Sequence, residues 1–205
     1  MTSSSELREQ FGNIDIYLFD QLLKGRFNTD MRLLDAGCGD GRNLVYFMRE
    51  GYSCFAVDGS AQAIEHVRRM ASLLAPRLPH QNFRVETIES MSFADESFDA
   101  VICSAVLHFA ANEDDFRRML EEMWRVLLRG GIFFARLASS IGIENKITAR
   151  GDGRYLLPDG SERFLVDEEM LLTETNKLGA EFLEPIKTTN VQNMRAMTTW
   201  CIRRS

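Results

Sequence analysis

Three glycines and two aspartates form the densest group of residues suited to binding a small ligand. Asp35 precedes a turn that has Gly37, Gly39 and Gly41 at alternate positions. Glycine adopts backbone angles closed to other residues and lets a ligand approach the main chain closely. Asp58 follows roughly 20 residues later, at the spacing where a carboxylate in α/β folds accepts hydrogen bonds from a ribose. The set predicts a nucleoside-binding site.

The spacing of these glycines distinguishes two kinds of nucleoside ligand. Dinucleotide sites carry G-x-G-x-x-G, whereas the spacing here is G-x-G-x-G, with Arg42 where the last dinucleotide glycine would fall. Together with Asp35 just before the turn, this spacing favours a ligand with an amino-acid end over one with a pyrophosphate. A nicotinamide-dependent oxidoreductase is the weaker alternative, and so is a strand-to-helix turn without a ligand. Arg42 is interpreted as a solvated residue of a first helical turn, with a carboxylate partner as the alternative.

Strand patterns alternate with helix patterns around this turn. Short apolar runs predict buried strands at 32–36, 53–57, 83–86, 98–103 and 132–137. Helical spacing predicts helices at 14–25, at 42–50, from a Ser60 cap to Pro76, and at 113–128 before the stop at Gly130-Gly131. This alternation favours a parallel α/β sheet with right-handed crossovers, whose ligand lies outside the carboxyl ends of the strands.

The rhythm changes after residue 138. Residues 155–166 are expected to form a β-hairpin around Asp159-Gly160. Asp167 can then cap a helix to about Leu178, with strands near 180–185 and 196–202. The 205 residues suit one domain, in which 1–30 form an N-terminal helical cap and 139–166 an insertion at the carboxyl edge of the sheet.

Composition narrows the classes of partner. The net charge is −6 and no dense run of Lys and Arg occurs, so no nucleic-acid partner is expected. The four cysteines are widely spaced without C-x-x-C, which predicts buried thiols, a reducing compartment and no metal site. No signal-peptide core and no run near the ~20 apolar residues of a membrane span is present, so a cytoplasmic location is expected. The oligomeric state stays undecided.

Five segments in order resemble the motifs of class I S-adenosylmethionine-dependent methyltransferases. Residues 33–41, Leu-Leu-Asp-Ala-Gly-Cys-Gly-Asp-Gly, are similar to the family's first motif, and Val57-Asp58 to its second. Residues 93–99 resemble the approach to its fourth strand, 103–108 the loop after that strand, and 127–131 the turn before strand five. The ordered set spans 33–135 and is more specific than any single match.

The resemblance implies a Rossmann-like, mostly parallel seven-stranded sheet with helices on both faces and an antiparallel last strand. It also implies S-adenosylmethionine as cofactor and S-adenosylhomocysteine as product. The residues it assigns to the cofactor are Asp35, Gly37, Cys38 and Gly39 around the methionine portion, Asp58 and Gly59 at the ribose, Ile88 and Glu89 at the adenine, and Ser104 near the amino group. One departure concerns the adenine, because Thr87 and Ile88 stand where the family often has Asp followed by a small residue.

The acceptor side has weaker signals. His108 is a candidate base or a polar pocket wall, and Tyr17 lies on a helix that could cover the site. Arg136 could meet an anionic acceptor, and Tyr155 with its hairpin could form another wall. The short cap and single small insertion favour a small-molecule acceptor. An RNA or protein methyltransferase and a non-catalytic S-adenosylmethionine-binding protein are the alternatives.

Overall fold

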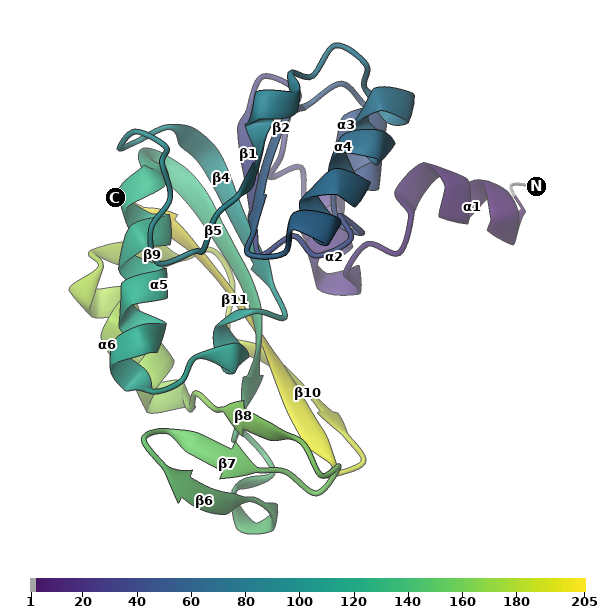
Figure 1. The fold of residues 1–205 in the computed structure, drawn as a ribbon. Helices are drawn as coiled ribbons and strands as arrows, with labels where there is room; N and C mark the ends of the chain where they lie inside the picture. The colour runs from purple at the N-terminus through teal and green to yellow at the C-terminus, as the bar shows by residue number, and fades with distance from the viewer. Residues whose placement is uncertain (1–2) are drawn as a thin grey trace.

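The protein is built on one large mixed sheet (Figure 1). The computed structural model describes residues 3–205. Seven strands lie in the order β10-β11-β5-β4-β1-β2-β3, and β9 pairs with the other end of β11. Their bounds are β1 Arg32–Ala36, β2 Ser53–Asp58, β3 Phe83–Val85, β4 Phe98–Ser104, β5 Leu127–Ser139, β9 Ala180–Phe182, β10 Lys187–Val191 and β11 Arg195–Arg204.

The pairing confirms the mostly parallel sheet with an antiparallel last strand. Strands β1 to β5 run parallel, whereas β11 is antiparallel to both β5 and β10. The chain adds β2 and β3 on one side of β1 and then places β4 on its other side. In open α/β sheets such a reversal leaves a crevice at the carboxyl ends of the two central strands. The turn after β1 and the loop after β4 therefore meet there.

Helices cover both faces of the sheet, as predicted. Figure 1 shows α3 and α4 on one face and α5 and α6 on the other. The helix bounds are α1 Ser4–Phe11, α2 Ile16–Leu23, α3 Val45–Arg49, α4 Ala61–Leu74, α5 Glu113–Val126 and α6 Glu168–Lys177, with 3-10 turns η1 His80–Asn82, η2 Leu107–Phe109 and η3 Glu144–Lys146. Phe47 and Ile64 are fully buried on the first face, Phe116 and Leu171 on the second. None of the helices within residues 3–205 has the length and apolar character needed to cross a membrane.

Side-chain caps begin five of the six α-helices in residues 3–205, among them Ser3 at α1 and Asp15 at α2. Ser60 Oγ accepts from the Ala63 N–H at 3.3 Å at the start of α4, as its sequence position predicts. Asp167 does the same for α6, accepting from the Met170 N–H at 2.7 Å. In α5 the cap is Asn112. Each cap satisfies one of the N–H groups that a first helical turn leaves without a partner.

The fifth strand begins earlier than predicted. Strand β5 starts at Leu127, which pairs with Phe98 of β4, and the pairing resumes at Ile132 with Ala100. The residues between form an irregularity in which Gly130 has a φ of 77°. The glycines therefore form a bulge within the strand instead of separating it from α5, because the backbone partner of Leu127 lies on β4.

The helix after the glycine turn is shorter than the predicted 42–50. Helix α3 begins at Val45, and residues 42–44 form a turn in which the Leu44 N–H donates to Gly41 O at 2.9 Å. Asn43 points its side chain toward the N-terminal segment, where Oδ1 accepts from the Asp15 N–H at 3.0 Å. This long-range hydrogen bond joins the turn before α3 to the N-terminal segment.

The predicted hairpin is part of a second, three-stranded sheet. Strand β7, Arg154–Leu156, pairs with β8, Glu162–Phe164, on either side of the expected Asp159-Gly160 turn. Strand β6, Thr148–Gly151, adds to β7 and was not predicted, because its residues are exposed and lack an apolar pattern. Figure 1 shows this small sheet beyond the carboxyl end of β5.

The late strands number three where two were predicted. The strand near 180–185 is the short β9, and the one near 196–202 is β11. The antiparallel hairpin is formed by β10 and β11, and the sequence pattern missed β10 because Lys-Thr-Thr-Asn-Val is polar and only partly buried.

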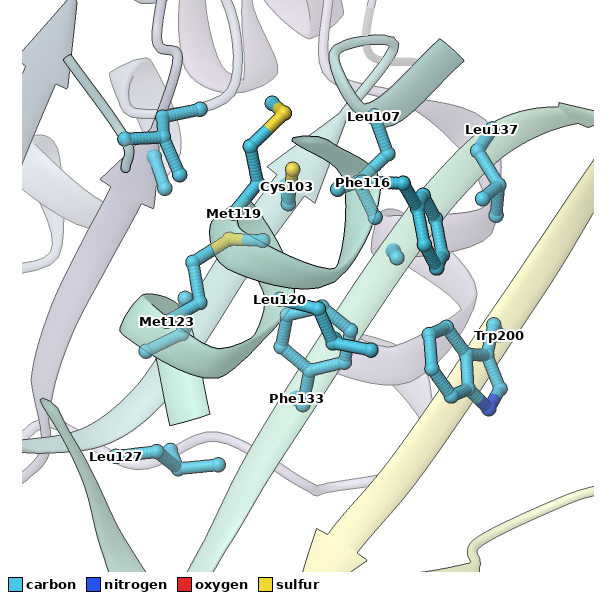
Figure 2. Packing of buried hydrophobic residues seen from close by; sticks show 14 of the residues in the cluster. Cys103, Leu107, Phe116, Met119, Leu120, Met123, Leu127, Phe133, Leu137 and Trp200 are labelled. Atoms are coloured by element: carbon cyan, nitrogen blue, oxygen red, sulfur yellow. The ribbon is translucent and has the colours of Figure 1, made fainter. Parts of the chain in front are cut away.

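Trp200 occupies the centre of the core on the α5 side. Figure 2 shows it beside Phe133, beneath the apolar side chains of α5. The two rings meet edge to face with centroids 5.5 Å apart, and the indole Nε1–H donates to Thr175 Oγ1 at 2.9 Å. Thr175 Oγ1 in turn donates to Leu171 O at 2.7 Å, so the indole joins β11 to α6.

Replacing Trp200 by Phe should lower the free energy of unfolding by roughly 2–3 kcal/mol. The change leaves a void and removes the donor to a buried hydroxyl. Urea denaturation followed by circular dichroism measures the effect. Trp124→Phe is the matched control, because Trp124 is only partly buried and its indole N–H has no protein partner among residues 3–205. Equal losses in the two variants would contradict this account of Trp200.

Candidate functional site

Three glycines shape the turn after β1. Gly37, Gly39 and Gly41 have φ values of 76°, 52° and 75°, in the region that favours glycine. A Cβ at Gly37 would lie 2.6 Å from a methyl group of Val106 and 3.2 Å from Cδ1 of Ile88. At Gly39 the same atom would meet nothing within 4 Å. Gly37 therefore permits close packing of three loops, whereas Gly39 borders open space.

The N–H groups of this turn are already bonded within the protein. Those of Gly37 and Cys38 donate to Val57 O at 2.9 and 3.1 Å. That of Gly39 donates to Asp58 Oδ2 at 2.9 Å. A pyrophosphate site works by offering free N–H groups to the anion, and here all three are engaged. The geometry favours a ligand that lies against the turn without needing an anion cradle.

Asp58 ends β2 beside a hollow of about 380 Å³. Its Oδ1 accepts from the Ser60 N–H at 2.8 Å, and its Oδ2 accepts from the Gly39 N–H. Gly59 follows with open space around its Cα. The hollow is lined by Gly39, Asp40, Asp58, Ser60, Gln62, Ala63, His66 and Arg69. A fixed carboxylate at the edge of such a hollow can accept hydrogen bonds from the hydroxyl groups of a sugar.

Asp35 is a carboxyl group buried without a full set of partners. It is 1% exposed, and Oδ2 has no hydrogen-bond partner among residues 3–205. Burial raises the pKa of Asp35 to about 7, and the charge of Arg42 acts in the opposite direction. A buried unsatisfied oxygen costs stability, so its retention suits a ligand that brings a donor or a positive charge.

The loop after β3 lies next to Asp58. The Glu86 N–H donates to Asp58 O at 3.2 Å, which fixes the loop against the end of β2. Ile88 is buried, with its side chain over Gly37, whereas Thr87 and Glu89 are exposed. The predicted adenine residues thus lie on the same side of the turn as Asp58.

The end of β4 has an unusual backbone. Ser104 is its last residue, and Ala105 has a φ of 65°, an uncommon value for alanine. The Ala105 N–H donates to Arg136 O at 2.7 Å, which holds the strained residue in place. Such strain costs on the order of 1–3 kcal/mol and gathers at functional sites. No residue pattern signals it, since glycine would be the expected residue here.

Asp15 joins the N-terminal segment to the carboxyl ends of β4 and β5. It caps α2 by accepting from the Tyr17 N–H at 2.9 Å. Its Oδ2 accepts from Ser104 Oγ at 3.4 Å and lies 3.8 Å from Arg42 Nη2 and 3.7 Å from Arg136 Nε. Arg42 also donates to Ser104 Oγ at 3.1 Å. The interpretation of Arg42 as a merely solvated residue was wrong, and sequence reasoning did not single out Asp15 as a site residue.

Tyr17 and Arg136, both candidate acceptor residues, contact each other. The Arg136 guanidinium carbon lies 4.3 Å from the centre of the Tyr17 ring. The Tyr17 hydroxyl is hydrogen-bonded to Thr189 of β10. Arg136 is 8% exposed, its Nη1 has no protein partner, and burial lowers its pKa. These contacts tie α2 over the end of the sheet.

His108 lines a cavity of about 310 Å³ that begins at Ala105. The cavity lies between the loop after β4, the end of β5, the small sheet and the β10–β11 hairpin. Its walls are Ala105, His108, Ala138, Leu157, Asp159, Ser161, Arg163, Arg195 and Met197. Of the predicted acceptor residues, His108 alone is among them. Arg163, Arg195 and Met197 were missed, because they come from segments whose proximity no local pattern reveals.

His108 is neutral near pH 7. Burial, followed by the charge of Arg163, lowers the pKa of His108 to about 4. Its Nδ1 accepts from the Ala138 N–H at 3.3 Å, so the ring proton lies on Nε2. His108 also packs against Phe109, with ring centroids 4.6 Å apart.

Tyr155 does not join this group. It lines another hollow of about 330 Å³, together with Arg117, Phe164 and Met170. Its side chain also packs against Ala138 and Leu157, which line the cavity beside His108, so Tyr155 lies behind the wall of that cavity.

Comparison with known proteins places the chain in a family. A model of the methyltransferase domain matches residues 34–135. An uncharacterized methyltransferase of Bacillus subtilis is 33% identical over 107 residues, which cover 51% of this chain and 40% of that protein. The tRNA 5-carboxymethoxyuridine methyltransferase of Escherichia coli is 25% identical over 142 residues, covering 69% and 52%. The chain thus spans about two fifths to one half of these relatives.

A solved structure extends the likeness to nearly the whole chain. An S-adenosylmethionine-dependent methyltransferase from Methanosarcina mazei superposes with a TM-score of 0.71 at 20% identity. The match covers 89% of this chain and 96% of that one, and at this identity it concerns the fold. Together with the glycine turn, the acid after β2 and the strand order, these findings identify the chain as a member of the class I S-adenosylmethionine-dependent methyltransferases.

Proposed function

We propose that the protein transfers the methyl group of S-adenosylmethionine to a small-molecule acceptor. When bound, the sulfonium supplies an electrophilic methyl group: an acceptor lone pair forms the new bond, the S–CH3 electrons stay on sulfur, and S-adenosylhomocysteine is released. The observation that carries the proposal is the cavity of about 310 Å³ whose wall includes Ala105, immediately after Ser104. Its volume lies at the lower end of the range of small-molecule sites.

The residues of the first half of the chain fit the cofactor. Asp58 would bind the ribose hydroxyls, and Gly39, with open space at its Cα, would let the ligand lie against the turn. Asp35 has an unpaired oxygen suited to the ammonium of the methionine portion. Ser104 would lie near the same group, and Ile88 would pack beside the adenine, with Glu89 at its exposed edge.

His108 would serve as a hydrogen-bond donor and not as the base. Its Nδ1 lone pair is engaged by the Ala138 N–H, which leaves the Nε2–H as the available group. That donor can orient an acceptor oxygen or nitrogen. Methyl transfer then rests mainly on positioning and exclusion of water, both of which a preformed cavity supplies.

An alanine at Asp58 should weaken S-adenosylmethionine binding by roughly 1.5–3 kcal/mol. The substitution removes a charged acceptor from the ribose and releases the Gly39 N–H. Calorimetric titration with S-adenosylmethionine and S-adenosylhomocysteine measures the loss. Glu50→Ala is the control, because it removes an exposed carboxylate that follows α3 and does not line the hollow, and it should leave affinity unchanged. Unaltered affinity in Asp58→Ala would remove Asp58 from the site.

An asparagine at Asp35 should stabilise the free protein while weakening cofactor binding. Between about pH 4 and pH 7 the folded state keeps the Asp35 proton that the unfolded state loses, so its contribution to stability falls as pH rises through this window. The side chain of Asp35→Asn does not titrate, so the variant avoids this loss of stability. Each kcal/mol gained in the free energy of unfolding should raise Tm by roughly 2–4 °C at pH 8.

Thermal unfolding at pH 8 and pH 4 measures the gain, which should be confined to the higher pH. Calorimetry with S-adenosylmethionine measures the accompanying loss of affinity. Asp30→Asn, at an exposed position, should change neither quantity. A lower Tm for Asp35→Asn at pH 8 would contradict the assignment of a buried, poorly paired carboxyl.

Labelling with S-adenosyl-[methyl-³H]methionine tests the class of acceptor. A bacterial cell extract is separated into a low-molecular-mass filtrate, total RNA and protein, and each is incubated with the enzyme. Label should enter only the filtrate. Met197→Trp places a larger side chain in the cavity. This variant should reduce labelling of the filtrate at least roughly tenfold without changing cofactor affinity. Label in RNA or protein would favour a macromolecular methyltransferase instead. Absence of label in all three, with cofactor bound, would favour a non-catalytic binding protein.

A further inference from the structure

We infer that the acceptor is an anion, whose carboxylate or phosphate group is held by Arg163 and Arg195 in the wall of the cavity beside His108. The inference rests on the proposed function, because it concerns the same cavity. It goes further in naming the charge of the acceptor and the side chains that select it. The remaining walls, Ala138, Leu157 and Met197, would contact the apolar body of such a molecule.

The two guanidinium groups come from different parts of the chain. Arg163 lies on β8 of the small sheet, and Arg195 begins β11. Neither has a carboxylate oxygen within 4 Å among residues 3–205. Arg42 and Arg136, which also lie near this end of the sheet, are both paired with Asp15. Arg163 and Arg195 are therefore the arginines of the cavity wall that are free to bind an anion.

Arg163 is held in place without an ion pair. Its Nη1 donates to Glu162 O at 2.7 Å, and its guanidinium carbon lies 5.0 Å from the centre of the Phe109 ring. Both contacts leave other N–H groups of the guanidinium unused, since arginine carries five. A planar guanidinium oriented in this way is suited to bind two oxygens of a carboxylate or phosphate.

Asp159 is the opposing charge in the cavity. Its Oδ1 accepts from the Ser161 N–H at 2.9 Å and from Ser161 Oγ at 2.6 Å. These hydrogen bonds, and then the charges of Arg195 and Arg163, lower the pKa of Asp159. The ionised groups of the wall are thus two arginines and one aspartate, while His108 is neutral near pH 7. The cavity carries one net positive charge in a chain whose net charge is −6.

Three small aromatic probes test the charge requirement, and two of them, benzoate and benzamide, have nearly the same shape. Benzoate, phenyl phosphate and the neutral benzamide are titrated into the full chain saturated with S-adenosylhomocysteine, and binding is followed by saturation-transfer NMR. One or both anions should bind at least roughly tenfold more tightly than benzamide, and the stronger one identifies the preferred group. Binding should weaken as sodium chloride is raised.

Charge-changing variants assign the effect to the cavity. Arg163→Gln and Arg195→Gln should each weaken anion binding by roughly threefold or more, with benzamide unaffected. Asp159→Asn should tighten it, because the amide keeps the Ser161 contacts while the repelling charge is lost. Arg150→Gln removes a charge from an exposed site on the same small sheet, outside the cavity, and should change nothing.

The outcomes separate this inference from the proposed function. Benzamide binding as tightly as the anions, or anion affinity unchanged in both arginine variants, would overturn the anionic acceptor and leave a small-molecule cavity intact. No binding of any of the three probes to the folded, S-adenosylhomocysteine-loaded protein would count against the small-molecule cavity itself. A response of Asp159→Asn opposite in sign to the arginine variants is not expected from a merely structural disturbance.

Discussion

The absence of a side chain at Gly37 is the constraint on which the rest of the site depends. A Cβ there would overlap Val106, from the loop after β4, and press on Ile88, from the loop after β3. Three loops from neighbouring strands can therefore close together only around a glycine with a positive φ. The strand reversal at β1 brings these loops to one edge, and Gly37 lets them pack. This packing brings Asp58, Ile88 and Ser104 together at one edge of the sheet.

The stability of the fold and the chemistry of the site oppose each other at Asp35. Every strand neighbour of this residue is apolar, and its unpaired oxygen has no structural use in the free protein. Other buried polar groups are paired, as the Trp200 indole is with Thr175, although Arg136 Nη1 and Thr199 Oγ1 also have no partner among residues 3–205. A fold can keep one such unfavourable group when the surrounding core is well packed, and functional sites are where such groups gather.

The half of the fold between residues 32 and 137 could be predicted closely from the sequence, because its signals are local. Strands β1, β2 and β4 appear as apolar runs, and Ser60 and Asp167 cap helices where expected. The errors came from long-range partners. Pairing with Phe98 extends β5 back through its glycines to Leu127. Strands β6 and β10 carry no apolar pattern, since each is a polar edge strand supported by its neighbour.

The difference between local signals and long-range contacts also explains why the cofactor residues were easier to predict than the cavity beside His108. The candidate cofactor residues lie in one stretch of chain whose order and spacing form a recognisable pattern. The cavity beside His108 is assembled from the loop after β4, the end of β5, a hairpin and the start of β11. Side chains such as Arg163 and Arg195 meet only because the small sheet and the β10–β11 hairpin fold over the same edge. Acceptor specificity built in this way can change through a few surface residues while the core pattern stays intact. The charge of the cavity is therefore a property that no local sequence pattern reveals, because it depends on which segments the fold brings together.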